Sequence, residues 1–335
     1  MSNHSGVENN ASRLANDTSD YLDTYRHFYI ASITVDTTFS VAGTLINVWF
    51  LAALLLSPEI RSRIRNRIIC GMLVVHLTEA MILCPLSVIR VTTILLKRYE
   101  SLDCYFETVH NSIYHIQDFV GNWYLLTLLC IYTAQVMNFE PKFTPLWKNI
   151  LNVLLFMSPC IFALLVVPIV MKSYYARYSD DRCLVTTFES IKVYKSLDTV
   201  VPQTLATLLL AVTAVLKYRR YYQRRSFDTL NAQLIDDGSQ TDPWYPFVAL
   251  FITAVASDFC LTVACMNPML FIGQGIQIWL NLYISFGVLA YSRLIFVPVM
   301  LLLFRDIRER IKIWRPCRRS ALLADLVVTY EKNTS

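Results

Sequence analysis

Residues 276–304, IQIWLNLYISFGVLAYSRLIFVPVMLLLF, carry a single charged side chain, Arg293. A helix needs about 20 mostly apolar residues to cross the ~30 Å hydrocarbon layer of a bilayer. Lipid cannot satisfy an open backbone, so each such stretch is expected to be helical. Six further stretches have similar length and composition: 37–58, 68–96, 119–139, 149–171, 199–216 and 244–271. The sequence therefore predicts an all-α membrane protein, a seven-transmembrane helix bundle.

The composition supports this prediction. Hydrophobic residues make up 55% of the 335 residues and charged residues 16%, whereas a soluble domain carries about 25% charged residues. Seven spans leave almost nothing of the 335 residues for a second domain. The net charge of +5 does not indicate a nucleic-acid partner, because most of the basic residues lie in the segments on one side of the predicted bundle.

Lysine and arginine are concentrated on one side of the predicted bundle. With the C-terminus inside, 19 of the 30 basic residues fall in the inner segments 57–67, 138–149, 217–243 and 305–335, and 9 fall in the outer segments. Positive residues favour the cytoplasmic side of short loops. We therefore expect a multi-pass plasma-membrane protein with an extracellular N-terminus and membrane lipids as partners.

Residues 1–28 are polar and contain three glycosylation sequons, at Asn3, Asn10 and Asn16. Sequons are used only in the secretory lumen, so this segment is predicted to be a glycosylated extracellular tail. It lacks an apolar core, and no cleavable signal peptide is expected. Residues 29–304 would then form the bundle, and residues 305–335 a cytoplasmic eighth helix and tail.

Two of the nine cysteines, Cys104 and Cys183, lie outside the spans on the predicted extracellular side. Disulfides persist in that environment, so a Cys104–Cys183 bridge is expected. Six other cysteines lie within or at the ends of spans and suit apolar packing. Cys317 is flanked by arginines near the membrane and is a candidate palmitoylation site; the alternative is a free cytosolic thiol.

The segment after the seventh span is amphipathic. Phe304, Ile307, Ile311 and Trp314 share one helical face, and arginine and lysine occupy much of the rest. This pattern is typical of a helix that lies in the headgroup plane. It completes the predicted fold as a seven-helix bundle with an amphipathic eighth helix.

This layout resembles the rhodopsin-like (class A) family of G-protein-coupled receptors. Gly43-Thr44-Leu45-Ile46-Asn47-Val48 looks like the family's first-helix signature, and further positions match its landmarks: Asn66, Pro85, Pro202, Pro298 and Asp306-Ile307-Arg308. The resemblance implies a receptor for an extracellular ligand, a peptide or a small chemosensory molecule. It also implies a heterotrimeric G protein as the cytoplasmic partner.

Several family motifs are altered. His76 or Glu79 stands near the second-helix aspartate, and Cys130-Ile131-Tyr132 replaces the acidic–arginine–tyrosine triplet, so the arginine that meets the G protein is missing. Helix six has Ser257-Asp258-Phe259-Cys260 where the family has tryptophan-x-proline, and Val297-Pro298-Val299-Met300-Leu301 replaces the seventh-helix motif. Such erosion is similar to that of fast-diverging orphan or chemosensory receptors.

Two ligand classes are disfavoured by the resemblance. The family's amine-binding aspartate falls on Asn111, which argues against an amine at that position, and the retinal lysine falls near Tyr291. No enzymatic constellation, metal site or cofactor is predicted. The alternative functions are a ligand-gated channel or transporter of unusual topology and a non-signalling seven-helix protein.

Ionisable side chains within the spans are costly and are candidate functional residues. Glu79, Asp258 and Arg293 lie at similar depths, roughly 17–21 Å from the inner boundary at about 1.5 Å per residue. We expect Arg293 to pair with Asp258 or Glu79, within a buried polar network that includes Asn47 and His76. A static structural lock is the competing interpretation.

A ligand pocket is predicted nearer the extracellular end. Its candidate residues are Tyr114, His115, Asp118 and Asn122 from the third span and Trp279 and Tyr283 from the seventh. Asp118 and His115 are three residues apart and share a helix face. Polar packing between helices and lipid-facing aromatic residues are the competing interpretations.

Overall fold

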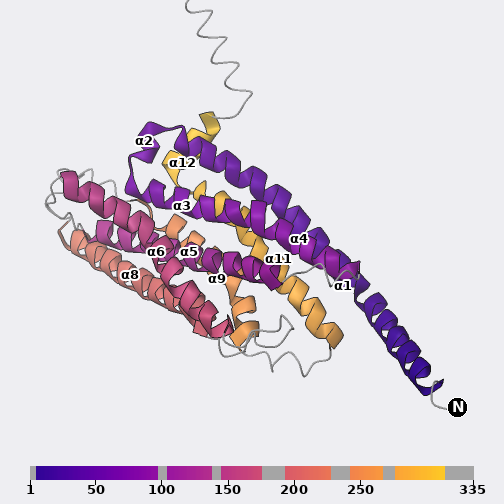
Figure 1. The fold of residues 1–335 in the computed structure, drawn as a ribbon. Coiled ribbons are helices and arrows are strands. Elements are labelled where there is room, and N and C mark those ends of the chain that lie inside the picture. Colours follow the sequence, from indigo (N-terminus) through magenta and orange to yellow (C-terminus); the bar gives the residue numbers. More distant parts are fainter. Residues whose placement is uncertain are drawn as a thin grey trace, which may run out of the picture.

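The computed structural model describes the backbone of residues 5–96, 104–137, 145–175, 193–227, 242–266 and 276–313, which is helical apart from short connections (Figure 1). Seven helices are long and apolar enough to cross a membrane, and a short C-terminal helix follows. The spans are Tyr25–Leu55, Ile64–Leu95, Ser112–Val136, Asn149–Val166, Val193–Arg220, Tyr245–Ala264 and Ile284–Leu301. The predicted fold class is confirmed.

The helices pack around α5, which contacts α3, α6 and α8, while α1 packs against α4 and α11, and α9 against α11. Their bounds are α1 (Ser5–Leu55), α2 (Pro58–Arg61), α3 (Ile64–Thr78), η1 (Glu79–Leu83), α4 (Cys84–Leu95), α5 (Cys104–Val136), α6 (Pro145–Tyr175), η3 (Ser196–Val200), α8 (Val201–Phe227), α9 (Tyr245–Met266), α11 (Ile276–Leu301) and α12 (Arg305–Ile313). The elements η1 and η3 are single π-helical turns.

The two ends of the bundle differ. Figure 1 shows α2 and α12 together at one end, which we call the α12 end, and the start of α1 projecting beyond the other end, which we call the α1 end. We expected the first helix to start near residue 30, but α1 begins at Ser5. Once the apolar span has formed a helix, adding residues to it avoids the cost of nucleation.

At three of the prolines within the helices, a side chain from a neighbouring helix donates to the carbonyl that lacks its N–H partner. Pro298 lies inside α11 and has no N–H to donate to the carbonyl of Leu294, four residues earlier. The side-chain amide of Asn47 donates to that carbonyl at 2.9 Å and to the Gly43 carbonyl at 2.7 Å. Asn47 therefore links α1 to α11 at the proline. Gly43 permits this approach, because a Cβ there would lie 3.1 Å from the Cβ of Leu294.

The other two prolines follow π-helical turns. In η1 the Cys84 N–H donates to the Glu79 carbonyl, five residues earlier. In the same i to i−5 pattern the donor for the Ala80 carbonyl would be residue 85, but Pro85 has no N–H. The hydroxyl of Ser40 donates to the Ala80 carbonyl at 2.7 Å. The helix therefore contains a π turn just before Pro85.

The turn η3 repeats this arrangement. The Val201 N–H bonds to the Ser196 carbonyl, and the Leu197 carbonyl, which would come next, faces Pro202. The indole N–H of Trp123 donates to that carbonyl at 3.2 Å. Side chains from neighbouring helices are what makes proline tolerable within a membrane span.

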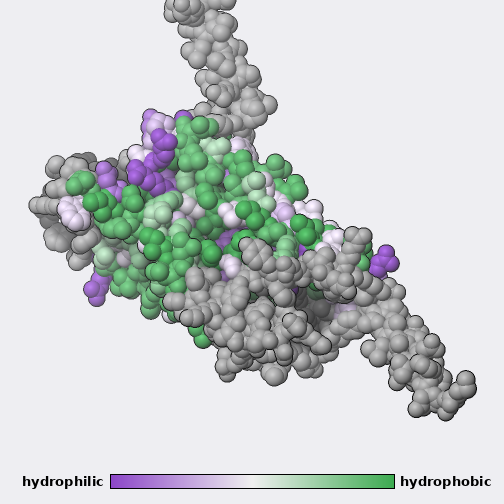
Figure 2. All heavy atoms as spheres, in the orientation of Figure 1, coloured by the Kyte–Doolittle hydropathy of each residue, from purple (hydrophilic) through white to green (hydrophobic). Residues whose placement is uncertain are grey.

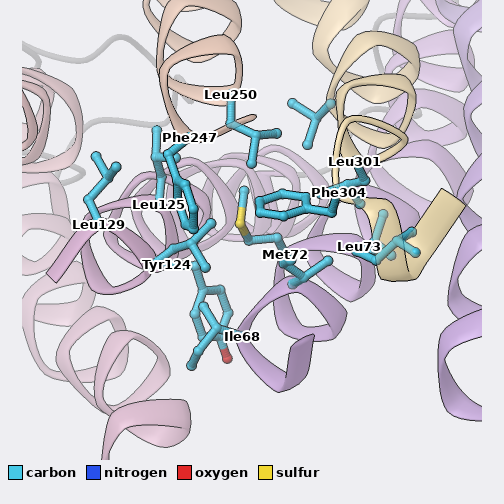
Figure 3. Close-up of a cluster of buried hydrophobic side chains, with 14 of the residues drawn as sticks. Ile68, Met72, Leu73, Tyr124, Leu125, Leu129, Phe247, Leu250, Leu301 and Phe304 are labelled. Carbon is cyan, nitrogen blue, oxygen red and sulfur yellow. The ribbon is translucent and has the colours of Figure 1, made fainter. Parts of the chain in front are cut away.

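The surface and the core fit a membrane environment. In Figure 2 hydrophobic side chains cover the middle of the visible face, and hydrophilic ones gather near the α12 end. Figure 3 shows the buried apolar cluster towards the α12 end, where the ring of Phe304 points towards Met72. Ile307 and Ile311 of α12 are buried in the same cluster. The apolar face predicted for the eighth helix therefore packs against the bundle.

Candidate functional site

One guanidinium group joins four helical segments in the middle of the bundle. Arg293 of α11 donates from Nε and Nη2 to the two carboxylate oxygens of Glu79 at 3.2 and 2.9 Å. Its Nη2 also lies 2.5 Å from Oδ1 of Asp118, and its Nη1 lies 3.0 Å from Oδ1 of Asp258. The Arg293 residue is only 9% exposed. We call these four residues the arginine hub.

The hub continues into a second buried ion pair. The Nζ of Lys195 lies 2.9 Å from Oδ2 of Asp118 and 3.0 Å from Oδ2 of Asp198. It also sits 5.5 Å from the centre of the Tyr114 ring. Asp118 thus bridges the two cations, with one carboxylate oxygen on each. Charges in such surroundings persist only when they are paired and hydrogen-bonded.

Proline-associated π turns contribute two of these carboxylates. Glu79 is the first residue of η1 and Asp198 lies within η3. A π turn adds a residue to the local repeat and so rotates the side chains that precede it relative to those that follow. Pro85 and Pro202 therefore help to determine which side chains face the bundle interior.

The hub separates two cavities, and Glu79, Asp258 and Arg293 line both of them. The smaller cavity lies towards the α12 end, has a volume of about 30 Å³ and is also lined by His76, Asn122 and apolar residues. That volume is sufficient for a water molecule. His76 Nδ1 lies 3.7 Å from Glu79, so this ring is adjacent to the hub.

The larger cavity lies towards the α1 end and has a volume of about 290 Å³. It is lined by charged and aromatic residues of several helices and by apolar side chains, among them Asp36, Arg90, Tyr114, His115, Asp118, Lys195, Leu261, Ile284, Tyr291 and Arg293. A mostly apolar cavity with a few converging polar groups is the usual form of a small-molecule site. We call it the hub cavity.

A second arginine cluster closes the α12 end. Arg65 of α3 forms ion pairs with Asp242, just before α9, and with Asp306 of α12. Its guanidinium carbon lies 4.6 Å from the centre of the Phe304 ring. Asn66 donates to the Ile60 carbonyl at 3.0 Å and to Asp306 at 3.3 Å. We call the group of Arg65, Asp242 and Asp306 the α12-end lock.

Stacked aromatic rings lie between the lock and the hub. The rings of Tyr132 and Phe247 are 3.9 Å apart and nearly parallel, and Phe247 meets Phe304 edge-on at 5.1 Å. Tyr132 belongs to the triplet Cys130-Ile131-Tyr132, which has no arginine where the rhodopsin-like family has one. In this chain Arg65, on a different helix, supplies an arginine at the same end of the bundle.

The structure brings together most of the predicted buried residues. Arg293 pairs with both carboxylates that the sequence offered as alternatives, Glu79 and Asp258, and additionally with Asp118. Asp118, Tyr114 and His115 line the hub cavity as one group. Asn47 is buried, and its side-chain amide donates to helix backbone, so it stabilises the proline break in α11.

Other predicted sites lie outside the described residues or side chains. These are the disulfide between Cys104 and Cys183, the sequons at Asn3, Asn10 and Asn16, the palmitoylation site at Cys317, and the aromatic side chains of Trp279 and Tyr283. They remain predictions. No site of three or more metal-ligating side chains occurs in the part of the chain that the structure describes.

Sequence reasoning missed three important charges. Lys195 and Asp198 lie before the predicted fifth span, 199–216, but the fifth span of the structure begins at Val193 and places both inside the bundle. The i, i+3 spacing of a lysine and an aspartate at the edge of an apolar run was the available signal. The third missed charge is Asp36, which lies inside the first span. A charged side chain within a span is by itself a signal of a candidate functional residue.

Comparisons with protein-family models and with curated proteins found no match for this chain.

Proposed function

We propose that this protein is a seven-transmembrane receptor of the plasma membrane that binds a ligand in the hub cavity and acts on a heterotrimeric G protein at the α12 end. The observation that carries this proposal is the arginine hub. Its residues form the floor of the hub cavity and belong to η1, α5, α9 and α11. A ligand that alters the ion pairs of Arg293 changes contacts among all of these segments at once.

Helix α9 offers a direct connection between the two ends. It carries Asp258 at the hub and Phe247 in the aromatic stack, eleven residues or roughly 16 Å apart at 1.5 Å per residue. Asp242, which pairs with Arg65, lies three residues before the first residue of α9. Movement of α9 at the hub would therefore strain both the stack and the lock.

The mechanism is a ligand-dependent shift between two arrangements of the bundle. In the arrangement described here, the lock and the aromatic stack hold α3, α9 and α12 together. A ligand shifts such an equilibrium only by the difference of its affinities for the two states. The second arrangement would release Asp242 from Arg65 and open a site for the cytoplasmic partner.

The orientation rests on the sequence. The sequons at Asn3, Asn10 and Asn16 and the excess of basic residues at the other side support an extracellular α1 end and a cytoplasmic α12 end. In that orientation the hub cavity faces the extracellular side, and Cys317 follows α12 at the cytoplasmic leaflet. Glycosidase treatment of the protein from intact cells tests this orientation, because an inverted topology leaves the sequons without sugar.

Opening the α12-end lock tests the function without knowledge of the ligand. Arg65→Ala removes both ion pairs, and we expect at least a threefold rise in basal recruitment of one class from a panel of engineered G proteins. Arg65→Lys keeps a charge and should have a smaller effect. The matched control is Arg305→Ala, because the Arg305 side chain is 82% exposed and pairs with Glu309 on its own helix.

The comparison is made at equal surface expression. Failure of both the unmodified chain and Arg65→Ala to recruit any G-protein class would refute G-protein coupling. If Arg65→Ala instead produced a membrane current, the ligand-gated channel would replace the receptor as the function.

A further inference from the structure

One carboxylate of the hub cavity lies outside the arginine hub. Asp36 of α1 is 4% exposed and lines the cavity. The Ser87 hydroxyl donates to its Oδ2 at 2.7 Å. Within the described part of the chain Asp36 has no ion pair, and its Oδ1 accepts no hydrogen bond. A buried carboxylate without a cation is costly, so its presence on a cavity wall calls for a partner.

The remaining charges of the cavity are already engaged. Arg293 and Lys195 are surrounded by four carboxylates, those of Glu79, Asp118, Asp198 and Asp258. Arg90, the third cation on the wall, also has a partner. An anionic ligand would therefore have to compete with existing ion pairs and would add to an excess of negative charge. A cationic ligand would instead pair with Asp36, whose carboxylate has no cation.

We propose that the hub cavity binds a small organic cation whose ammonium or amidinium group pairs with Asp36. This inference rests on the proposed receptor function and specifies its ligand class. Ser87 holds one carboxylate oxygen and leaves the other for the ligand. The rings of Tyr114 and Tyr291 line the same cavity and suit a cation, while Leu83, Leu261 and Ile284 provide apolar contacts. The 290 Å³ volume restricts the ligand to a compact molecule.

This position differs from the one that the family resemblance suggested. Asn111 of α5 stands where the family has its amine-binding aspartate, and the sequence disfavoured an amine for that reason. Asp36 supplies a carboxylate from α1 instead. The competing explanation is that Asp36 is permanently protonated and serves only to bond Ser87 between α1 and α4.

Charged thiol reagents can measure the preference of the cavity before any ligand is known. Ser32 lines the cavity, and Ser32→Cys introduces a reactive thiol into the full-length chain. Its reaction rates are measured with 2-(trimethylammonium)ethyl and 2-sulfonatoethyl methanethiosulfonate; each forms a mixed disulfide and releases methanesulfinate. The chain without Ser32→Cys gives the background of the nine native cysteines, and 2-mercaptoethanol gives the intrinsic rate ratio.

We expect the cation-to-anion rate ratio at the introduced thiol to exceed that of 2-mercaptoethanol at least tenfold. Adding Asp36→Asn should bring the ratio within twofold of the free-thiol value, whereas Asp36→Glu should keep it high. A ratio at or below the free-thiol value overturns the proposal. A high ratio that Asp36→Asn leaves unchanged overturns it as well, because the preference would then arise elsewhere.

A second measurement keeps the proposal testable if Asp36→Asn does not fold. In the Ser32→Cys chain, 2-phenylethylamine should slow labelling at least fivefold more than 2-phenylethanol at the same concentration. Equal protection by the two compounds overturns the proposal. Both experiments use purified protein without a G protein. A cation-selective cavity in a chain that recruits no G protein would therefore refute the function while retaining the binding site.

Discussion

The arginine hub and the α12-end lock use the same chemistry in different surroundings. Each places one buried arginine against at least two carboxylates from other helices or their flanking residues. The carboxylates of the hub are buried, whereas the side chains of Asp242 and Asp306 are 18% and 23% exposed. Solvent and salt reach the second group and screen its charges. We therefore expect loss of a hub charge to cost more stability than loss of a lock charge, and the lock to open more readily.

The largest effect is expected from removing the hub cation. Arg293→Gln strands Glu79 and Asp258 and leaves Asp118 with Lys195 as its remaining cation. Loss of one partner of a buried pair costs about 3–5 kcal/mol. We expect almost no protein at the cell surface and a strongly lowered Tm in detergent. Arg305→Gln, at an exposed arginine of α12, is the control and should resemble the unmodified chain.

The number of hub partners sharpens that prediction. If Arg293 had a single partner, as the sequence suggested, exchanging the two charges would restore expression. Glu79, Asp118 and Asp258 all contact Arg293. After one exchange the new carboxylate at position 293 still faces the other two carboxylates and is repelled by them, so recovery of surface expression should be partial at most. Full recovery by Arg293→Asp with Asp258→Arg would show that only one of the three contacts matters.

The second largest effect is expected at Lys195. Lys195→Met leaves Asp198 without its cation and removes one of the two cations on Asp118, which keeps Arg293. Because one carboxylate is stranded completely and the other only partly, we expect a loss of about 3 kcal/mol in the free energy of unfolding. Thermal unfolding of the purified protein measures it, with the exposed Lys312→Met as control. Equal stability of the two variants would contradict the buried ion pair.

Packing between the hub and the lock should respond to a single methyl group. A Cβ at Gly71 would lie 2.8 Å from Cζ of Tyr124 and 3.1 Å from Cε2 of Phe156. The Tyr124 hydroxyl donates to the Phe156 carbonyl at 2.9 Å, which restrains this ring. Gly71→Ala should therefore cost about 1–3 kcal/mol by overpacking, measured as a lower Tm.

Gly287 provides the matched control for Gly71. Apart from its own helix backbone and chain neighbours, a Cβ at Gly287 has no atom within 4 Å of it in the described structure, so Gly287→Ala should not lower Tm. Two glycine-to-alanine variants with the same Tm would mean that the layer between hub and lock is loosely packed, and that the two regions could move independently.

A smaller effect on stability is expected at the lock. Asp242→Asn removes one of the two ion pairs of Arg65, which keeps Asp306, so we expect a smaller loss of stability than at Lys195, where Asp198 loses its cation completely. The variant should have nearly normal Tm but higher basal G-protein recruitment. A fall in Tm as large as that of Lys195→Met would place the lock among the structural elements and would remove its proposed role as a switch.

The smallest effect is expected on the surface of α12. Arg305 donates a hydrogen bond to Glu309 at 2.7 Å and thereby lowers the pKa of that carboxyl group. A lowered pKa means that the pair stabilises the helix above the ordinary pKa of glutamate and loses this effect as pH falls through the lowered value. Both side chains are exposed, so Glu309→Gln should not change Tm measurably at neutral pH.

The sequence by itself determined the seven spans and the depth of the charges within them. Hydropathy is a local property, and depth increases linearly with residue number along a helix. For that reason Glu79, Asp258 and Arg293 could be placed at one level, and the amphipathic face of α12 could be identified. Lys195 was missed because the start of a span after a polar loop is poorly defined by hydropathy.

Only the tertiary structure decided which charges meet. Contact depends on the direction of each side chain around its helix axis and on the order of the helices, and neither follows from depth. The π turns before Pro85 and Pro202 change that direction locally, so a regular helical repeat cannot predict where Glu79 and Asp198 point. Asp36 on the cavity wall and Arg65 against Asp242 likewise depend on which helices pack together, a long-range property of the folded chain.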